Sequence, residues 1–387
     1  MSSANRTIID VIKEGANTYG QTPSVGHPTR LWWNSESLAQ NQETQESPII
    51  TSDRDYHDLI DLGSTTGGEI NAFMSYGASD IFIEGLLGTD FSAASEKAAT
   101  EITAAGVVSA AAHGFSVGDL VDIKGFGKAA NNGTFRITAK TANNFTVDNV
   151  NAAAEVHAAT ATLPAFSTSG FTRNSFTVQK EFPEVSAFHV YKGMVVGSMA
   201  VAVSPTSPIT ADVTMAGATH DVASVSQLPG NAARAAYAGT MVGGRRAKVL
   251  DTVNLGATPH IMSMDITLDN QVRQNREVGK ANPFEARFSR LRVTGNLNLY
   301  FQDRALYESF VNQLDAGLTI ELNDSRPGQA VGTYNRYIVD MPRMRLSTGT
   351  VLATGVDADV MASFTFQTLY KPEYEFSLRW YRIPKTP

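Results

Sequence analysis

Alternation of apolar and polar residues with a period of two dominates the second half of this 387-residue chain. From Leu291 to Phe301, one set of alternate positions is mostly apolar and the other carries Arg, Thr and Asn. Successive side chains of a strand point to opposite faces, so this pattern predicts a strand with one buried face. The same pattern recurs at 264–268, 318–322 and 360–366, and earlier at 209–215. We therefore expect a mainly β protein.

Helical spacing of apolar residues is much rarer. Leu306, Phe310 and Leu314 recur at intervals of four, with Asp303 as a candidate N-cap and Gly317 as a candidate stop. A second short apolar run covers 78–87. These two segments predict one short helix in each core domain.

Two blocks of the sequence occur twice in the same order. In the first block, Gly68–Met74 aligns with Gly295–Phe301, and one of the helix-like runs follows each copy. In the second block, Phe188–Val196 resembles Tyr337–Arg345, and an alternating strand follows each copy. An ordered repeat of this kind indicates two copies of one structural unit.

The blocks lie farther apart in the first copy, which indicates an insertion at 93–168. Ala-rich flanks surround a run of short strands there. Asn132-Gly133 is a strong hairpin-turn dipeptide, because both residues tolerate positive φ. We expect a small independent β-barrel.

These observations divide the chain into four parts. Residues 1–92 and 169–215 form the first repeat around the 93–168 module, 216–258 is a linker or arm, and 259–387 is the second repeat. The 216–258 segment is rich in Gly, Ala and Ser and carries Arg245, Arg246 and Lys248. A long segment with little periodicity is typical of a linker or a functional arm.

Composition excludes several classes of function. With a net charge of −7 and 42% hydrophobic residues, the chain lacks the cationic excess of proteins that grip nucleic acid and the polarity of disordered ones. The absence of cysteine excludes disulfides, thiolate metal sites and thiol nucleophiles. The N-terminus has no apolar signal segment, and Gly193–Val203 is too short to span a bilayer. We expect no membrane segment and synthesis in the cytoplasm.

One candidate metal site and one candidate phosphate loop occur. Asp53, Asp55 and His57 alternate, so a strand would project them from one face towards a divalent cation, although a solvated face is the commoner arrangement. Residues 125–128 resemble a phosphate loop but lack its first glycine and its Ser or Thr. We expect a loop between strands there, and no metal or cofactor.

Candidate catalytic residues are equally sparse. Glu181 and Glu184 form a carboxylate pair of the kind that glycosidases use, and Trp32-Trp33 can stack on a sugar. Acidic pairs are also common on surfaces, and aromatic pairs are common in cores and interfaces. Without a catalytic constellation, we expect no enzyme.

Several diffuse motifs carry a resemblance to a known family. They are Ile49–Arg54 leading to Gly68–Asn71, Phe176–Lys180 with Gly193–Val196, Val293–Gly295 with Leu299–Phe301 and Leu306-Tyr307, and Met341–Arg343 through Phe364–Gln367. In these the chain resembles the major tail tube proteins of long-tailed, non-contractile bacteriophages. The insert, through His113–Asp119, is similar to small β-modules of phage structural proteins and departs from the plain tube pattern.

The resemblance implies a structural function. Each repeat would be a β-sandwich or half-barrel with a flanking helix, whose sheet joins neighbours in a ring, and stacked rings would form a tube for double-stranded DNA. Two copies per chain imply trimeric, pseudo-hexameric rings in the virion, assembled in the host cytoplasm with a tape measure protein and tail terminator or tip proteins. A tail-tip or baseplate hub protein and a glycan-degrading tail enzyme are the alternatives.

Three further expectations concern the tube. A DNA conduit must not bind its cargo, so the net negative charge predicts an acidic lumen. Strand parity alone gives Asp212, Glu321 and Asp359 as lumen-lining candidates, although any of them can also be an ordinary solvated residue. The 93–168 module is expected to project outside the tube, and 216–258 to contribute to stacking between rings.

Overall fold

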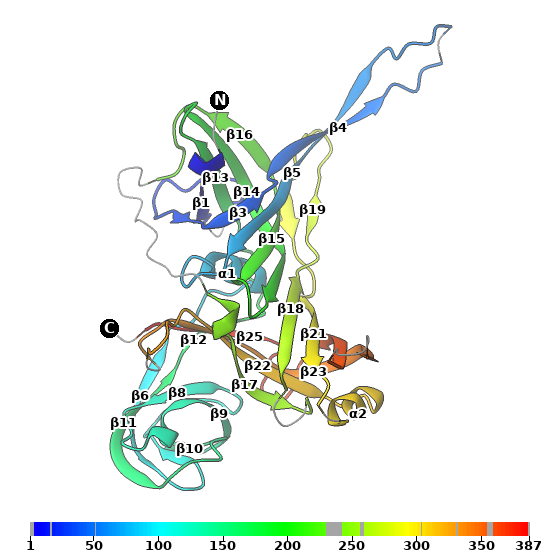
Figure 1. Cartoon of the computed structure of the whole chain (residues 1–387). Helices are drawn as coiled ribbons and strands as arrows, with labels where there is room; N and C mark the ends of the chain where they lie inside the picture. The colour runs from blue at the N-terminus through cyan, green and yellow to red at the C-terminus, as the bar shows by residue number, and fades with distance from the viewer. Residues whose placement is uncertain are drawn as a thin grey trace.

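The computed structural model describes residues 4–15, 18–50, 52–229, 242–255, 259–302, 304–329, 332–353 and 359–385. Strands dominate these residues and only two α-helices occur among them, which confirms the mainly β prediction (Figure 1). No helix in these ranges is long and apolar enough to span a membrane.

The first half of the body is a run of antiparallel neighbours in the order β1–β13–β14–β15–β5. Their bounds are β1 (Ile8–Lys13), β5 (Leu59–Phe73), β13 (Phe176–Phe182), β14 (Ala187–Val203) and β15 (Thr210–Gly217). Helix α1 (Asp80–Leu87) follows β5 and packs on β14. Smaller strands complete this half, namely β2 (Thr29–Arg30) on β1, β3 (Trp33–Glu36) and β4 (Ala39–Glu46) on β5, and β16 (Thr219–Ala223) on β14.

The second half has the corresponding order β17–β22–β23–β24–β21. The bounds are β17 (Lys248–Val253), β21 (Arg292–Tyr300), β22 (Ala316–Asn323), β23 (Arg336–Leu352) and β24 (Met361–Thr368). Helix α2 (Ala305–Val311) follows β21 and packs on β23. Strand β18 (Ile261–Asp269) pairs with β21, and β25 (Arg379–Ile383) pairs with the start of β23, as β16 does with β14.

The sheet register aligns the glycines of the first repeated block. Gly68 lies opposite Met215 of β15, and Gly295 lies opposite Phe366 of β24. A Cβ atom at Gly68 would lie 2.5 Å from the carbonyl oxygen of Ser37, and one at Gly295 would lie 2.1 Å from the carbonyl oxygen of Asp265. Close approach of backbones therefore requires glycine at both positions.

The second repeated block is aligned one residue differently from the sequence prediction. Met194 lies opposite Phe176, and Met344 lies opposite Ala316, so Met194 and Met344 occupy corresponding places. The sequence alignment had matched Met194 with Arg343. The start of β23 is buried on both of its faces, so alternation could not fix the register there.

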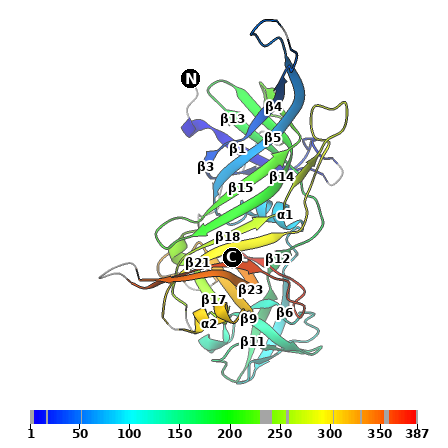
Figure 2. The same ribbon diagram turned by 90° about the vertical axis from the view of Figure 1, so that its right-hand side faces the viewer.

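One curved sheet runs through both halves. The ends of β14 and β18 pair from Ser198–Asp269 to Val203–Met264 and so join the halves in the order β4–β5–β15–β14–β18–β21–β24–β23. Figure 2 shows β5, β15, β14, β18 and β21 side by side. The starts of β14 and β23 leave this sheet at β-bulges and form a second layer, with a continuous hydrophobic core between the layers.

The inserted segment forms a closed barrel in the order β10–β7–β6–β11–β8–β9, as predicted. Its strands are β6 (Ser95–Ile102), β7 (Val107–Ser109), β8 (Leu120–Lys124), β9 (Gly133–Lys140), β10 (Asn144–Val147) and β11 (Glu155–Leu163), and β12 (Ala165–Thr168) leaves it to pair with β25. The predicted tight turn at Asn132-Gly133 is wrong. Asn132 has a φ of −104°, and its side chain bonds Phe126 across a longer loop that contains η2 (Ala129–Asn131).

The barrel is inserted into the sequence of the first half of the body, but it packs against strands of the second half (Figure 1). Leu120 of β8 forms a buried cluster with Ile338 of β23 and with Tyr381 and Ile383 of β25. The hydroxyl of Tyr381 also accepts a hydrogen bond from the Leu120 amide at 3.2 Å. The barrel is therefore fixed to the body by tertiary contacts as well as by its two chain connections.

The β4–β5 hairpin extends beyond the body as a long arm (Figure 1). A second hairpin, β19 (Arg273–Asn275) with β20 (Glu285–Arg287), lies beside its base. The Ser64 amide donates to the Ala281 carbonyl at 2.9 Å, and Arg276 forms an ion pair with Glu43. The base of the arm is thus held in place by the second hairpin.

The 216–258 segment contains regular structure in its described parts. Strand β16, η3 (Gly244–Arg246) and β17 lie in it, and both strands pair within the body. Within this segment, 230–241 and 256–258 lie outside the described residues. The candidate N-cap Asp303 also lies outside them. At the start of the chain, η1 (Ala4–Arg6) precedes β1.

Candidate functional site

The side of the curved sheet that faces away from the core is the first candidate site, and we call it the polar face. On β18, for example, Met264, Ile266 and Leu268 are buried in the core, whereas Asp265 and Thr267 alternate with them on the opposite side. Its polar and small residues are Glu69, Asn71, Ser198, Ala200, Asp212, Thr214, Asp265, Thr267, Asp269, Arg292, Thr294, Asn296, Asn298, Arg345, Thr348, Thr350, Ser363, Thr365 and Gln367. Tyr300 and Leu352 lie at strand ends with the same parity and are 41% and 57% exposed.

Small uncharged groups and carboxylates dominate this face. Its acidic residues are Glu69, Asp212, Asp265 and Asp269, and its basic residues are Arg292 and Arg345. Nε of Arg345 lies 2.8 Å from the Asp315 carboxylate, which Arg343 also contacts at 2.8 Å. The hydroxyl and amide groups are well hydrated, and the carboxylates outnumber the arginines, so the face has no cationic excess that would hold a polyanion.

Asp212, the first of the predicted lumen residues, belongs to the polar face. It lies on β15, and its carboxylate accepts a hydrogen bond from the side-chain amide of Asn71 on β5. Its exposure and strand parity agree with the sequence analysis, although the side of a tube it faces stays a prediction.

Glu321 does not lie on a solvated face. It is only 4% exposed, and its carboxylate lies 3.3 Å from Arg336 of β23 and accepts a hydrogen bond from Asn323 at 2.8 Å. Every residue of β22 is buried, because the strand lies between the core and the inserted barrel. The assumption that a polar residue opposite an apolar row faces solvent is wrong here.

Asp359 is exposed but lies just before β24, outside the sheet. Conversely, Glu69, Asp265 and Asp269 were missed as candidates. The alternation at 264–268 already placed Asp265 opposite the apolar row, so the signal was present in the sequence.

Asp53, Asp55 and His57 lie in the loop at the tip of the arm and not on a strand. Nε2 of His57 lies 2.8 Å from the Asp53 carboxylate, which also accepts a hydrogen bond from the Asp55 amide. Across the parts of the chain that the structure describes, no three His, Asp or Glu side chains gather as a metal site. The same tip exposes large apolar side chains, including Ile49 and Ile50 at 67% and 98%.

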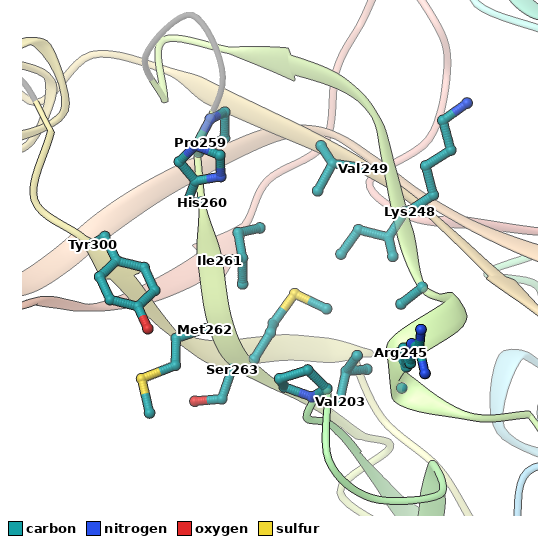
Figure 3. A pocket seen from close by; sticks show the side chains of 15 residues that line it. Val203, Arg245, Lys248, Val249, Pro259, His260, Ile261, Met262, Ser263 and Tyr300 are labelled. Carbon is teal, nitrogen blue, oxygen red and sulfur yellow. The ribbon is translucent and has the colours of Figure 1, made fainter.

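A cleft of about 580 Å³ lies between β17 and β18 (Figure 3). Val249 and Ile261 line it, Arg245 and Lys248 lie on one side, and Tyr300 lies on the other. None of the described residues that line it is acidic. Such a lining offers no carboxylate pair for glycoside hydrolysis.

In the first half of the body, the place that corresponds to this cleft is filled by a strand. There β2 pairs with β1, and the Leu31 amide donates to the Ile9 carbonyl at 3.0 Å. The cleft is therefore a difference between two otherwise corresponding halves.

The remaining candidates have structural partners. Trp33 packs against the core, whereas its neighbour Trp32 is 38% exposed. Glu184 pairs with Arg6.

The 125–128 segment is a loop between β8 and β9. Its Gly127 and Lys128 amides donate to the Glu155 carboxylate at 2.8 and 3.1 Å, which occupies the groups that a phosphate would need.

Comparison with known proteins identifies the family. The family model described as "Phage tail tube protein" matches residues 5–368, which is nearly the whole chain, whereas no curated protein matches. The chain belongs to the phage tail tube protein family. It is accordingly a structural component of a phage tail, present in the virion as part of a multi-subunit assembly.

Proposed function

We propose that this member of the phage tail tube family is the major tail protein of a long-tailed, non-contractile phage. Chains assemble into rings, and rings stack into a tube through which double-stranded DNA reaches the host. The polar face carries this proposal, because one continuous sheet presents mostly small polar and acidic side chains on this side while its other side is buried in the core.

We further propose that the two halves are copies of one tail-tube domain, and that three chains close a pseudo-hexameric ring. Corresponding strand order, matching bulges and the shared Gly68 and Gly295 register support the duplication. Closed rings of repeated heterologous contacts are a common geometry for such assemblies.

Stacking between rings is assigned to the β4–β5 arm and to the 216–258 segment. Exposed apolar side chains at the tip of a two-stranded arm favour burial against another chain. The 93–168 barrel then lies on the outside, the tape measure protein occupies the lumen during assembly in the host cytoplasm, and terminator and tip proteins cover the tube ends.

Electron microscopy of the purified protein tests this function. We expect tubes or stacked rings with a threefold repeat of chains, whereas a ring of six chains would contradict the stoichiometry. Counting copies per virion separates a tube protein, which should be by far the most abundant tail component, from a tip or hub protein. Turnover of host polysaccharide would favour the enzyme alternative.

A further inference from the structure

We infer that neighbouring chains in the ring join by antiparallel pairing of residues 348–353 with residues 36–41 of the next chain, in the register of the β14–β18 pairing. This inference rests on the proposed ring. Its partner is a second copy of this chain.

The β14–β18 pairing is the junction between the two halves of one chain. Ser198 lies opposite Asp269, Ala200 opposite Thr267, and the pairing continues to Val203 opposite Met264. If the halves are copies, a ring repeats this junction between chains as well as within them. The structure then contains a template for the contact between chains.

Residues 348–353 correspond to the β14 side of the template. Met194 and Met344 occupy matching places, and the next register shift follows Val196 in β14 and Leu346 in β23. Ser198–Val203 therefore corresponds to 348–353. Within the described residues, this part of β23 pairs with β24 on one side and leaves its other edge open, and Leu352 is 57% exposed.

Residues 36–41 correspond to the β18 side. Asp265 of β18 lies opposite Asn296 and approaches Gly295, and a Cβ there would lie 2.1 Å from the Asp265 carbonyl. The Ser37 carbonyl approaches Gly68 in the same way, at 2.5 Å from an added Cβ. Ser37 thus matches Asp265, and the next residues, Leu38 and Ile266, are both buried in the core.

Residues 36–41 pair with β5 on one side and, among the described residues, with no strand on the other. The Leu38 amide donates to the Glu36 carboxylate and the Leu38 carbonyl accepts from the Tyr191 hydroxyl, both at 2.9 Å, so side chains hold these backbone groups in the single chain and a strand of the next chain would take their place. An open strand edge is a ready template for pairing with another chain. In the template, Ser198–Val203 pairs with Met264–Asp269. Replacing each segment by its counterpart, 348–353 and 36–41 of the next chain, gives the contact between chains. Thr350 lies opposite Ala39 of the next chain, Val351 opposite Leu38, and Leu352 opposite Ser37.

This register keeps the faces of the sheet continuous. Ala39 pairs with Gly67, so it lies on the side of Glu69, and Thr350 lies on the polar face of β23. Val351 packs against the core, as Leu38 does. A slip of one residue would bring a core side chain to the polar face.

Disulfide formation tests the register, since the chain has no cysteine of its own. The variant carrying Thr350→Cys and Ala39→Cys is assembled, oxidised mildly and run on a non-reducing gel. We expect covalent dimers and trimers, but no larger product from isolated rings. The matched control, Thr350→Cys with Gln40→Cys, should cross-link at least tenfold less, because adjacent strand residues point to opposite faces.

A second control calibrates the template. Ala200→Cys with Thr267→Cys should form a disulfide within one chain, without an increase in mass. If the 350/39 variant does not assemble, Leu352→Cys with Ser37→Cys tests the same register. Two results would overturn the register and leave the proposed function intact. In the first, rings form but cross-link only when the cysteines are at 350 and 40. In the second, rings form but cross-link neither at 350 and 39 nor at 352 and 37. Absence of rings from the unmodified protein would instead refute the proposed function and this inference with it.

Discussion

Arg136 of the inserted barrel and Asp340 of β23 form a buried ion pair through two hydrogen bonds, Nη1–Oδ2 at 2.9 Å and Nη2–Oδ1 at 2.7 Å. Asp340 is fully buried, and Arg136 is 6% exposed. Burial alone would lower the pKa of the guanidinium, but the Asp340 carboxylate outweighs it and raises that pKa above its ordinary value. Arg136 is therefore charged at every accessible pH.

Charge pairs cross this interface in both directions. Arg336 of β23 lies 2.8 Å from Asp122 of β8, and Arg379 of β25 lies 2.7 Å from Asp119 of the barrel. Each side thus supplies arginines to carboxylates of the other. Such reciprocal pairs fix one orientation of the barrel on the second half.

Replacing Asp340 with alanine should lower the free energy of unfolding by about 3–5 kcal/mol, because it leaves the buried Arg136 charge without its partner. Urea unfolding at neutral pH measures the change. Arg6→Ala is the matched control, since Arg6 is 63% exposed and its pair with Glu184 should contribute at most about 1 kcal/mol. Equal, small effects of both changes would contradict the importance of the buried pair. Replacing both partners, as in Arg136→Met with Asp340→Leu, should recover much of the loss.

Replacing residues 93–168 with a Gly/Ser linker should leave ring formation intact but lower the melting temperature. The open edges at 36–41 and 348–353 lie outside the deleted segment, whereas Asp340 and Arg336 lose their barrel partners. Adding Asp340→Leu to the deletion should raise the melting temperature again. A folded deletion variant without rings in the electron microscope would show that the barrel makes ring contacts.

Gly295→Ala should destabilise the protein by about 1–3 kcal/mol, the usual result of overpacking. The added Cβ would meet the Asp265 carbonyl at 2.1 Å and the Phe366 ring at 2.5 Å. Gly243→Ala serves as the control, because that glycine has a φ of −98° and nothing within 4 Å of an added Cβ. Thermal unfolding of the two variants should therefore differ clearly, and similar melting temperatures would refute the close approach.

His189 and His220 should make the protein less stable in acid. Their ring nitrogens lie 3.0 Å apart, and Lys180, Glu36 and Asp221 are the charged groups around them. Burial and then Lys180 lower the pKa of His189, while burial and then His189 lower the pKa of His220.

The unfolded chain therefore binds more protons than the folded one below about pH 6.5, and stability falls as the pH drops through that range. Urea midpoints at pH 7.5 and 5.5 measure this loss, which His220→Gln should reduce. His157→Gln, at an exposed position on the barrel, should retain it. An unchanged pH dependence in His220→Gln would exclude the pair as its source.

Local patterns predicted part of this fold, and contacts between distant residues explain where they failed. Alternation identified β18, β21 and β24, because each has one core face and one polar face. It misassigned Glu321, because the barrel covers the second face of β22. The partner of Arg136 lies 204 residues away, and no local pattern records such a pairing.

The polar face leads to the last prediction, which concerns DNA passage. Changing Asp212, Asp265 and Asp269 to lysine should leave tubes intact, because exposed and half-exposed charges contribute little to stability. Glu321 is omitted from this set, since its substitution would break a buried ion pair. Each new cation that contacts a phosphate adds affinity that weakens with salt, so ejection should slow several-fold near 10 mM salt.

The slowing should be much smaller near 150 mM, where the screening length is about 8 Å instead of about 30 Å. Time-resolved release of DNA from phage carrying each variant measures it. The control set, Glu96, Glu101 and Glu373 changed to lysine, alters the net charge equally at exposed positions away from the polar face. Because only a lumenal charge meets the moving DNA, the control phage should eject at the unmodified rate at both salt concentrations. Equal ejection rates for the two sets at low salt would place the polar face outside the lumen.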